Sequence, residues 1–172
     1  MTKLLLTTLL FCFGAFALSA QAPANNDAEF EKAYKRRIRQ EALYGVYIPK
    51  DLTEAFMQLN KKIEPNLRKK FQAMPEDMAT EKLFFSLGRW MTHNWQFYGG
   101  SRLSHYMKTQ LGVHHPDDMS RFIIITYHRS LNKKPLQVKE LLAQFEAEKL
   151  EKQKKRMQKG TILHEEKRTR QH

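Results

Sequence analysis

The chain has 172 residues, which allows one modest domain with extensions at its ends. Its formal net charge of +12 predicts attraction to an anionic membrane surface, to an acidic polysaccharide or to an acidic protein. The only cysteine, Cys12, lies in an apolar run near the N-terminus that we expect to be cleaved off. The mature chain would then contain no cysteine, which excludes disulfides and thiol catalysis.

The N-terminal residues have the layout of a secretory signal peptide. Lys3 provides the positive charge, residues 4–18 are apolar, and the letters LSAQA supply small residues for cleavage after Ala20. The apolar run is shorter than the roughly 20 residues that span a bilayer, so an uncleaved anchor is the less favoured alternative. We therefore expect residues 1–20 to be removed and the protein to be periplasmic or secreted. Export without disulfides is typical of the bacterial envelope, and this compartment makes nucleic acid an unlikely partner.

After a short leader, a polar helix is expected over residues 27–43. Its apolar residues recur at helical spacing in a narrow stripe that includes Phe30, Tyr34 and Ile38. Gly45 ends this helix, and Pro49 holds the residue before it in an extended conformation. These two residues predict a boundary between a leader with its polar helix, residues 21–44, and a helical domain.

Start signals mark the next helices. Asp51 approximates a capping box with Glu54 and begins a helix whose apolar residues follow a helical period. Pro65 opens a short second helix, and Pro75 opens a longer one that runs to position 95. Gly88 lies inside the longer helix, where glycine costs about 1 kcal/mol relative to alanine, and it predicts the close approach of another helix.

Two further helices complete the predicted domain. Ser101 caps a helix over residues 101–111, and Gly112 follows as a natural C-cap. Residues 117–131 form the next predicted helix, with apolar side chains on one face. The run 122–125, in which three β-branched isoleucines follow a phenylalanine, is also compatible with a buried strand, but no turn residue interrupts the helical pattern around it.

The C-terminal segment, residues 135–172, is expected to begin as a helix at Pro135. Its first turns carry apolar residues that can dock on the domain, and lysines dominate beyond Leu150. From Lys133 onward the chain has 12 Lys and Arg against 6 Asp and Glu, which leaves half of the net charge there. Pairs such as Glu148–Lys152 support a solvated helix. The functional alternative is electrostatic tethering to an acidic surface.

These elements predict an all-α protein. Residues 45–134 are expected to form a compact orthogonal bundle of about five to six helices. An extended basic helix follows in residues 135–172 and is expected to become disordered at its end.

The letters HHPDD, residues 114–118, have a structural and a chemical interpretation. A proline at the first helical position loses no hydrogen bond, and Asp117 and Asp118 lie near the positive end of the helix dipole, each worth about 0.3–1 kcal/mol. This explains the pattern without any function. A metal site would need His114 or His115 with an aspartate and further ligands, and no histidine pair at helical spacing supports it. We therefore predict no metal and no cofactor.

His93, His105 and His128 fall on three separate predicted helices. They could converge on a metal or acid–base site, but buried histidines are more often hydrogen-bonded within a core. The structural alternative is a buried polar network of Asn94, Asp118, His128 and Arg129, with Arg102 as a further candidate member.

The letters WQFYGGSR, residues 95–102, form the strongest binding pattern. Gly100 lets the backbone approach a ligand closely, Ser101 exposes N–H groups at a helix N-terminus, and Arg102 adds a cation with a fixed fork of donors. Trp95 and Tyr98 could stack on a sugar or on a side chain. We predict a ligand- or anion-binding site here; the alternative is that the turn and its aromatics only complete the core.

No serine lies in a G-x-S-x-G elbow, and adjacent carboxylates cannot flank a sugar as glycosidases require. The sequence therefore favours a non-catalytic binding or interaction module. The alternative is a hydrolase acting on an envelope polymer, with His115 or His128 as acid–base and Asp117 or Asp118 as the orienting group. That alternative requires the GGSR turn and the HPDD helix start to open into one cleft.

Several short motifs lie between positions 48 and 132. The letters IPKDL, GRWMTHNW, GGSRL, HPDDMS and YHRSLN together resemble a bacterial family of small domains of unknown function. The resemblance covers about half of the chain and implies one domain flanked by segments outside it. It carries no catalytic assignment, but it draws attention to the residues that match its pattern: Trp90, Asn94, Trp95, Gly100, Ser101, Arg102, His115, Asp117, Asp118, His128 and Arg129.

Overall fold

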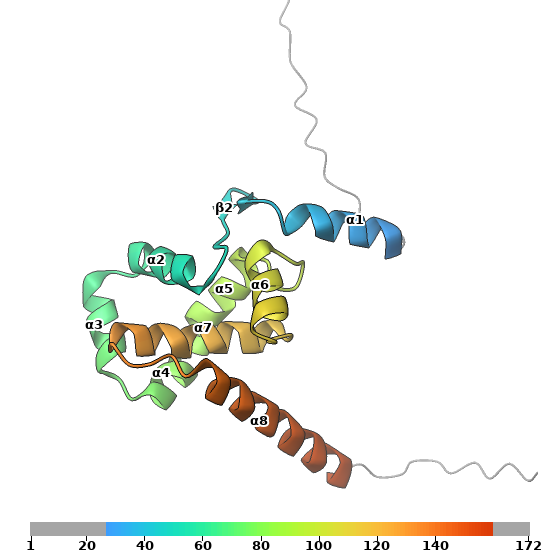
Figure 1. The fold of residues 1–172 in the computed structure, drawn as a ribbon. Helices are drawn as coiled ribbons and strands as arrows, with labels where there is room; N and C mark the ends of the chain where they lie inside the picture. Colours follow the sequence, from blue (N-terminus) through green and yellow to red (C-terminus); the bar gives the residue numbers. More distant parts are fainter. Residues whose placement is uncertain (1–26, 160–172) are drawn as a thin grey trace, which may run out of the picture.

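The computed structural model describes residues 27–159, and the predicted signal peptide lies outside them. The described chain is helical apart from one short hairpin (Figure 1), which confirms the predicted all-α class. No helix within residues 27–159 is both long and apolar enough to cross a membrane.

The elements follow one another with short connections. In chain order they are α1 (Asp27–Arg37), β1 (Ala42–Leu43), β2 (Val46–Tyr47), α2 (Leu52–Lys62), α3 (Pro65–Ala73), α4 (Glu76–Leu83), the π-helical turn η1 (Phe84–Gly88), α5 (Arg89–Asn94), α6 (Arg102–Gln110), α7 (Pro116–Leu131) and α8 (Val138–Lys159).

Helix α7 lies at the centre of the fold. Every residue from Phe122 to Arg129 is buried, and α2 to α6, η1 and α8 all contact this helix. A helix that is apolar on all sides is one that is covered on all sides. The run of β-branched residues that resembled a strand in the sequence therefore reflects complete burial of a helix.

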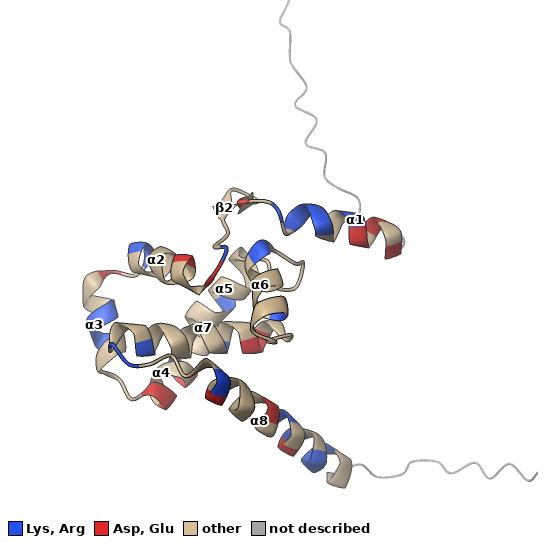
Figure 2. Ribbon diagram, viewed as in Figure 1, with Lys and Arg blue, Asp and Glu red and all other residues tan. Residues whose placement is uncertain are grey.

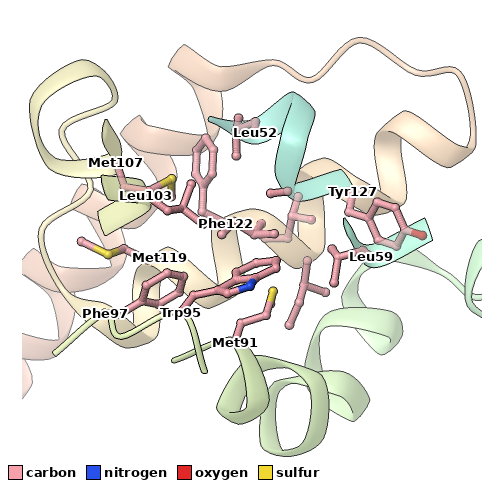
Figure 3. Close-up of a cluster of buried hydrophobic side chains, with 14 of the residues drawn as sticks. Leu52, Leu59, Met91, Trp95, Phe97, Leu103, Met107, Met119, Phe122 and Tyr127 are labelled. Atoms are coloured by element: carbon pink, nitrogen blue, oxygen red, sulfur yellow. The ribbon is translucent and has the colours of Figure 1, made fainter. Parts of the chain in front are cut away.

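The core is built around aromatic and methionine side chains (Figure 3). Trp95, Phe97 and Met91 come from α5 and the turn after it, and they lie among Phe122 of α7 and the other labelled side chains. All four are at most 1% exposed. Each such side chain contributes roughly 1.5–3 kcal/mol by its removal from water.

The N-terminal segment differs from the prediction. Helix α1 ends at Arg37 rather than at Leu43, and Ala42 pairs with Tyr47 in an antiparallel hairpin. Tyr44 and Gly45 both have positive φ angles, 50° and 77°, which is the conformation that a two-residue hairpin turn requires. Helix α1 has no fully buried residue, and Phe30 of its apolar stripe is 53% exposed.

The long helix predicted to begin at Pro75 is interrupted. The turn η1 separates α4 from α5, and Pro75 precedes α4 instead of lying in its first turn. Gly88 meets α7 closely, as predicted, because a methyl group there would lie 3.4 Å from Cδ1 of Ile124. Similarly, α8 begins at Val138 and not at Pro135.

Charge is distributed unevenly over these helices. Figure 2 shows basic residues on the second half of α1 and along α8. In α8 the last nine residues, 151–159, contain five Lys and Arg and one Glu. Figure 1 shows α8 leaving the domain, with only its first part against α7.

Candidate functional site

The GGSR corner, residues 99–102, is shaped by tight local geometry. Gly100 has a φ of 87°, and a methyl group on it would lie 2.5 Å from the ring of Tyr34 in α1. Ser101 is fully buried and forms a capping box with Ser104, so its hydroxyl and its N–H are both bonded within the corner. The hydroxyl of Tyr34 lies 3.0 Å from Nδ1 of His105, which anchors α1 over the corner.

Arg102 is held by the chain segment that precedes α2. Its Nε donates to the carbonyl oxygen of Ile48 at 2.6 Å, and its terminal nitrogens lie 3.5 Å from Glu54 and 3.6 Å from Glu41. Its guanidinium also lies 5.0 Å from the ring centre of Tyr47. The cation predicted to hold an anion is thus engaged with two carboxylates, and only 14% of its side chain is exposed.

Glu54 is the centre of this cluster. Hydrogen bonds to its carboxylate lower the pKa of Glu54 from 4.5 to about 2. The largest contribution comes from the backbone N–H of Lys50, and smaller ones come from Tyr47 and from the Lys50 side chain. Its carboxylate therefore stays charged and keeps Arg102 and Lys50 in place. Glu54 was predicted only as a capping residue, because nothing in the local sequence places position 54 beside position 102.

The aromatic residues of the corner separate into two environments. Trp95 is 1% exposed and belongs to the core, where its ring lies edge-on to Trp90. Tyr98 is 68% exposed, and its hydroxyl donates to a carboxylate oxygen of Asp117 at 3.4 Å. Of the five residues predicted to bind a ligand, Tyr98 is the one with a freely accessible ring.

The HPDD helix start has the predicted architecture. His115 is the N-cap of α7, and its Nδ1 accepts from the N–H of Asp117 at 3.2 Å. Asp118 lies 3.9 Å from Arg121. His115 itself is exposed, and both aspartates are partly exposed.

The residues of the alternative hydrolase come together only in part, because His115 lies beside both aspartates at the start of α7 while His128 and Arg102 lie elsewhere. His128 and His115 are 13 positions apart at opposite ends of α7, which corresponds to about 20 Å along a helix. Arg102 faces the segment before α2, whereas His115 and both aspartates of the HPDD motif line grooves beside α8. No group of three or more His, Cys, Asp or Glu in residues 27–159 is arranged to hold a metal ion.

A buried polar network surrounds the end of α7. Arg129 binds both carboxylate oxygens of Glu76, with distances of 2.6 and 2.9 Å, and donates to the Leu136 carbonyl at 2.7 Å. His128 places Nε2 3.0 Å from the carbonyl oxygen of Met74, and its Nδ1 lies 3.9 Å from Glu76. Arg129 lowers the pKa of Glu76 by hydrogen bonding to its carboxylate.

Two of the four predicted network residues therefore lie in this network, and two lie elsewhere. Asn94 bonds to the Trp90 carbonyl within its own helix, and Asp118 lies at the other end of α7. Glu76 was not predicted as a member. The signal for it was weak, since an acidic residue in the first turn of a helix is already explained by the dipole.

Two open grooves flank α8 where it crosses the start of α7. The α6–α8 groove, of about 960 Å³, lies between the loop after α6 and one face of α8. The α4–α8 groove, of about 820 Å³, lies between α4 with η1 and the neighbouring face of α8. His115, Asp118 and Arg121 line both.

Residues 48–131, just under half of the chain, match a protein family described as a domain of unknown function (DUF6794). The match runs from Ile48, before α2, to the last residue of α7, and it supports the resemblance to an uncharacterised small-domain family. Helix α1, the hairpin and α8 lie outside it. Neither the curated proteins nor the solved structures contain a match to this chain.

Proposed function

We propose that this protein is an exported, non-catalytic binding module that takes an acidic polypeptide segment into its α6–α8 groove. The observation that carries the proposal is the composition of that groove: an apolar lining beside a wall of exposed cations from α8. The proposed export rests on the signal-peptide pattern in residues 1–20.

The apolar lining comes from both sides of the groove. Leu111 and Val113 belong to the loop after α6, and Leu142 and Phe145 belong to α8. All but Val113 are partly exposed, so their side chains can still bury area against a ligand. A concave apolar surface suits a side-chain-bearing polymer better than it suits a flat bilayer.

The cations lie further along α8. Lys149, Lys152 and Arg156 follow one another at three- and four-residue spacing and therefore share one face of the helix. Neither Lys149 nor Arg156 has an ion pair among the described residues, whereas Lys152 lies 3.8 Å from Glu148. Glu146 is an acid of this lining nearer the start of α8, so the groove becomes more cationic toward the free end of the helix.

The base of α8 is fixed, which gives the groove a defined shape. Leu141 is buried against the domain, and the ring of Phe145 lies edge-on to Phe122 of α7. Arg121 lies over Phe145 and pairs with Glu148 at 3.1 Å. A preformed site avoids part of the entropy cost of binding.

Binding of a fluorescein-labelled peptide with paired glutamates between single leucines would test the proposal. We expect Lys149→Glu/Arg156→Glu to weaken binding at least about tenfold, which is about 1.4 kcal/mol. The matched control is Lys69→Glu/Lys70→Glu in α3, which changes the net charge equally at two exposed lysines and should bind like the unmodified chain. Fluorescence anisotropy measures both.

Two results would contradict the proposal. Equal weakening by both double variants would mean that net charge alone drives association. Binding to phosphatidylglycerol vesicles without binding to the peptide would assign α8 to a membrane surface instead. A peptide with glutamine in place of glutamate should fail to bind in every case.

A further inference from the structure

The α4–α8 groove has a charge opposite to that of the whole chain. Six carboxylates line it, against two Lys and Arg side chains, in a chain with a net charge of +12. Glu76 and Glu148 are neutralised by Arg129 and Arg121. Asp77, Glu81 and Asp117 have no ion pair within the described residues, so an uncompensated negative charge remains at the groove.

Aromatic side chains accompany these acids. Phe84 and Phe85 of η1 line the groove opposite α8, and Phe85 is 71% exposed. Asp77 and Glu81 lie four positions apart on α4, so they share one helix face. The groove therefore offers an apolar ring beside a row of carboxylates, which is complementary to a helix that carries both apolar and cationic residues.

The outer half of α8 has this composition, and its large apolar side chains are exposed among residues 27–159. Leu150, Lys154 and Met157 are spaced by four and three positions, so they form one stripe, and Leu150 and Met157 are 55% and 73% exposed. Leu150 lies nine residues after Leu141, which puts it about half a turn away from the face that docks on the domain. A straight helix therefore cannot turn this stripe into its own groove.

We infer that the α4–α8 groove of one copy binds the outer stripe of α8 from a second copy. The charge complementarity between the cationic helix end and the acidic groove supports this occupant. Because each copy has one helix and one groove beside each other, two copies can exchange helices about a two-fold axis and close the contact. This inference uses a different groove and a different face of α8 from the proposed peptide site.

Sedimentation velocity of the chain from residue 21 over a wide range of concentration would test the inference. We expect a dimer that dissociates as salt rises, since the screening length falls from about 10 Å at 0.1 M to about 3 Å at 1 M. Lys154→Glu/Lys155→Glu and Asp77→Lys/Glu81→Lys should each be monomeric. An equimolar mixture of the two variants should restore association, because the reversed charges match again.

Circular dichroism of each variant checks that α8 and α4 remain helical, since Lys155 pairs with Glu151 at 2.6 Å. The control Lys69→Glu/Lys70→Glu should dimerise like the unmodified chain. A chain that stays monomeric throughout would overturn the inference. So would a dimer that survives both charge reversals, or one that the mixture of folded variants does not restore.

Discussion

The GGSR corner and the two grooves beside α8 contrast in how their polar groups are used. At the corner, Ser101 is buried in a capping box and Arg102 is shared between two carboxylates and a backbone carbonyl. Along α8, Lys149 and Arg156 line a groove and have no ion pair in the described chain. A cation that is already paired stabilises a fold, and one that is unpaired at a concave surface is available to a partner.

The two regions also differ in their relation to the family match. The corner lies inside the matched segment, but α1 and the hairpin, which cover it, lie outside. Both grooves combine matched residues of α7 with α8, which is also outside the match. The flanking segments of this chain thus cover the GGSR corner at one surface of the domain, and they form a wall of both grooves at another.

The largest change in unfolding free energy is expected at Trp95, and it should distinguish this residue from Tyr98, the other aromatic residue predicted to bind a ligand at the corner. Replacing Trp95 by alanine should lower the free energy of unfolding by about 3–5 kcal/mol, because the ring is 1% exposed in the core. Tyr98→Ala should change it by less than about 0.5 kcal/mol, since that ring is mostly exposed. Urea unfolding measures both losses, with the helical circular dichroism signal in the far ultraviolet as the probe because it does not depend on Trp95. A loss from Trp95→Ala as small as the loss from Tyr98→Ala would place Trp95 at the surface.

The next prediction compares two glycines with similar backbone conformations. The positive φ angles, 87° and 72°, should alone make Gly100→Ala and Gly112→Ala each cost about 1–2 kcal/mol. Gly100→Ala should cost more, since its methyl group also meets the Tyr34 ring, whereas space at Gly112 is open. The difference between the two losses measures how firmly α1 covers the corner.

Removing Tyr34 provides the control for this comparison. In a Tyr34→Ala background the methyl group at Gly100 has no ring to meet, so Gly100→Ala should then cost as little as Gly112→Ala. If Gly100→Ala remains equally destabilising without Tyr34, the backbone alone accounts for the loss and α1 does not press on the corner.

A third prediction concerns pH and the ion cluster at the corner. Hydrogen bonds, chiefly from the Lys50 N–H, lower the pKa of Glu54 to about 2, below its ordinary value of 4.5. A group with a lowered folded-state pKa contributes stability above its unfolded pKa and loses it as the pH falls through the folded value. The free energy of unfolding should therefore decline between about pH 4.5 and pH 2 with a component that Glu54→Gln removes.

Glu151 provides a matched comparison on α8. Lys155 lowers the pKa of Glu151 through a hydrogen bond, but both side chains are exposed, so solvent screens the pair. Glu151→Gln should leave the acid dependence of unfolding unchanged. An equal change in both variants would show that the corner cluster is no better protected from water than the end of α8.

The elements that could be predicted from the sequence depend on local chemistry. Asp51, Pro65, Ser101 and Pro116 each mark a helix start at or within one position of the observed one, because capping is decided by residues within one turn. The hairpin was missed because the predicted helix was extended to Leu43, through the first strand of the hairpin. The interruption at η1 has no local signal beyond Gly88.

The site was harder to predict because its contacts join distant positions. Tyr34 reaches His105, and Glu41 and Glu54 reach Arg102, so the corner is closed by residues 48 to 71 positions away. A pattern such as GGSR shows which groups a turn carries, but not whether the rest of the chain already uses them. The grooves depend on the direction in which α8 leaves the domain, and no residue type determines that direction.

The smallest change in unfolding free energy is expected for the cations of α8, and comparing it with the change at Arg102 tests the contrast between the groove and the GGSR corner. Lys149→Glu/Arg156→Glu should change the free energy of unfolding by less than about 0.5 kcal/mol, because neither side chain has an ion pair to lose among residues 27–159. Arg102→Met, by contrast, leaves Glu54 beside an uncharged side chain and removes the bond to the Ile48 carbonyl, so it should be clearly destabilising. Thermal unfolding of the two variants at neutral pH makes the comparison. A large loss of unfolding free energy in the α8 variant would mean that Lys149 and Arg156 hold the helix in place. That result would contradict the claim that these two cations are free to bind a partner.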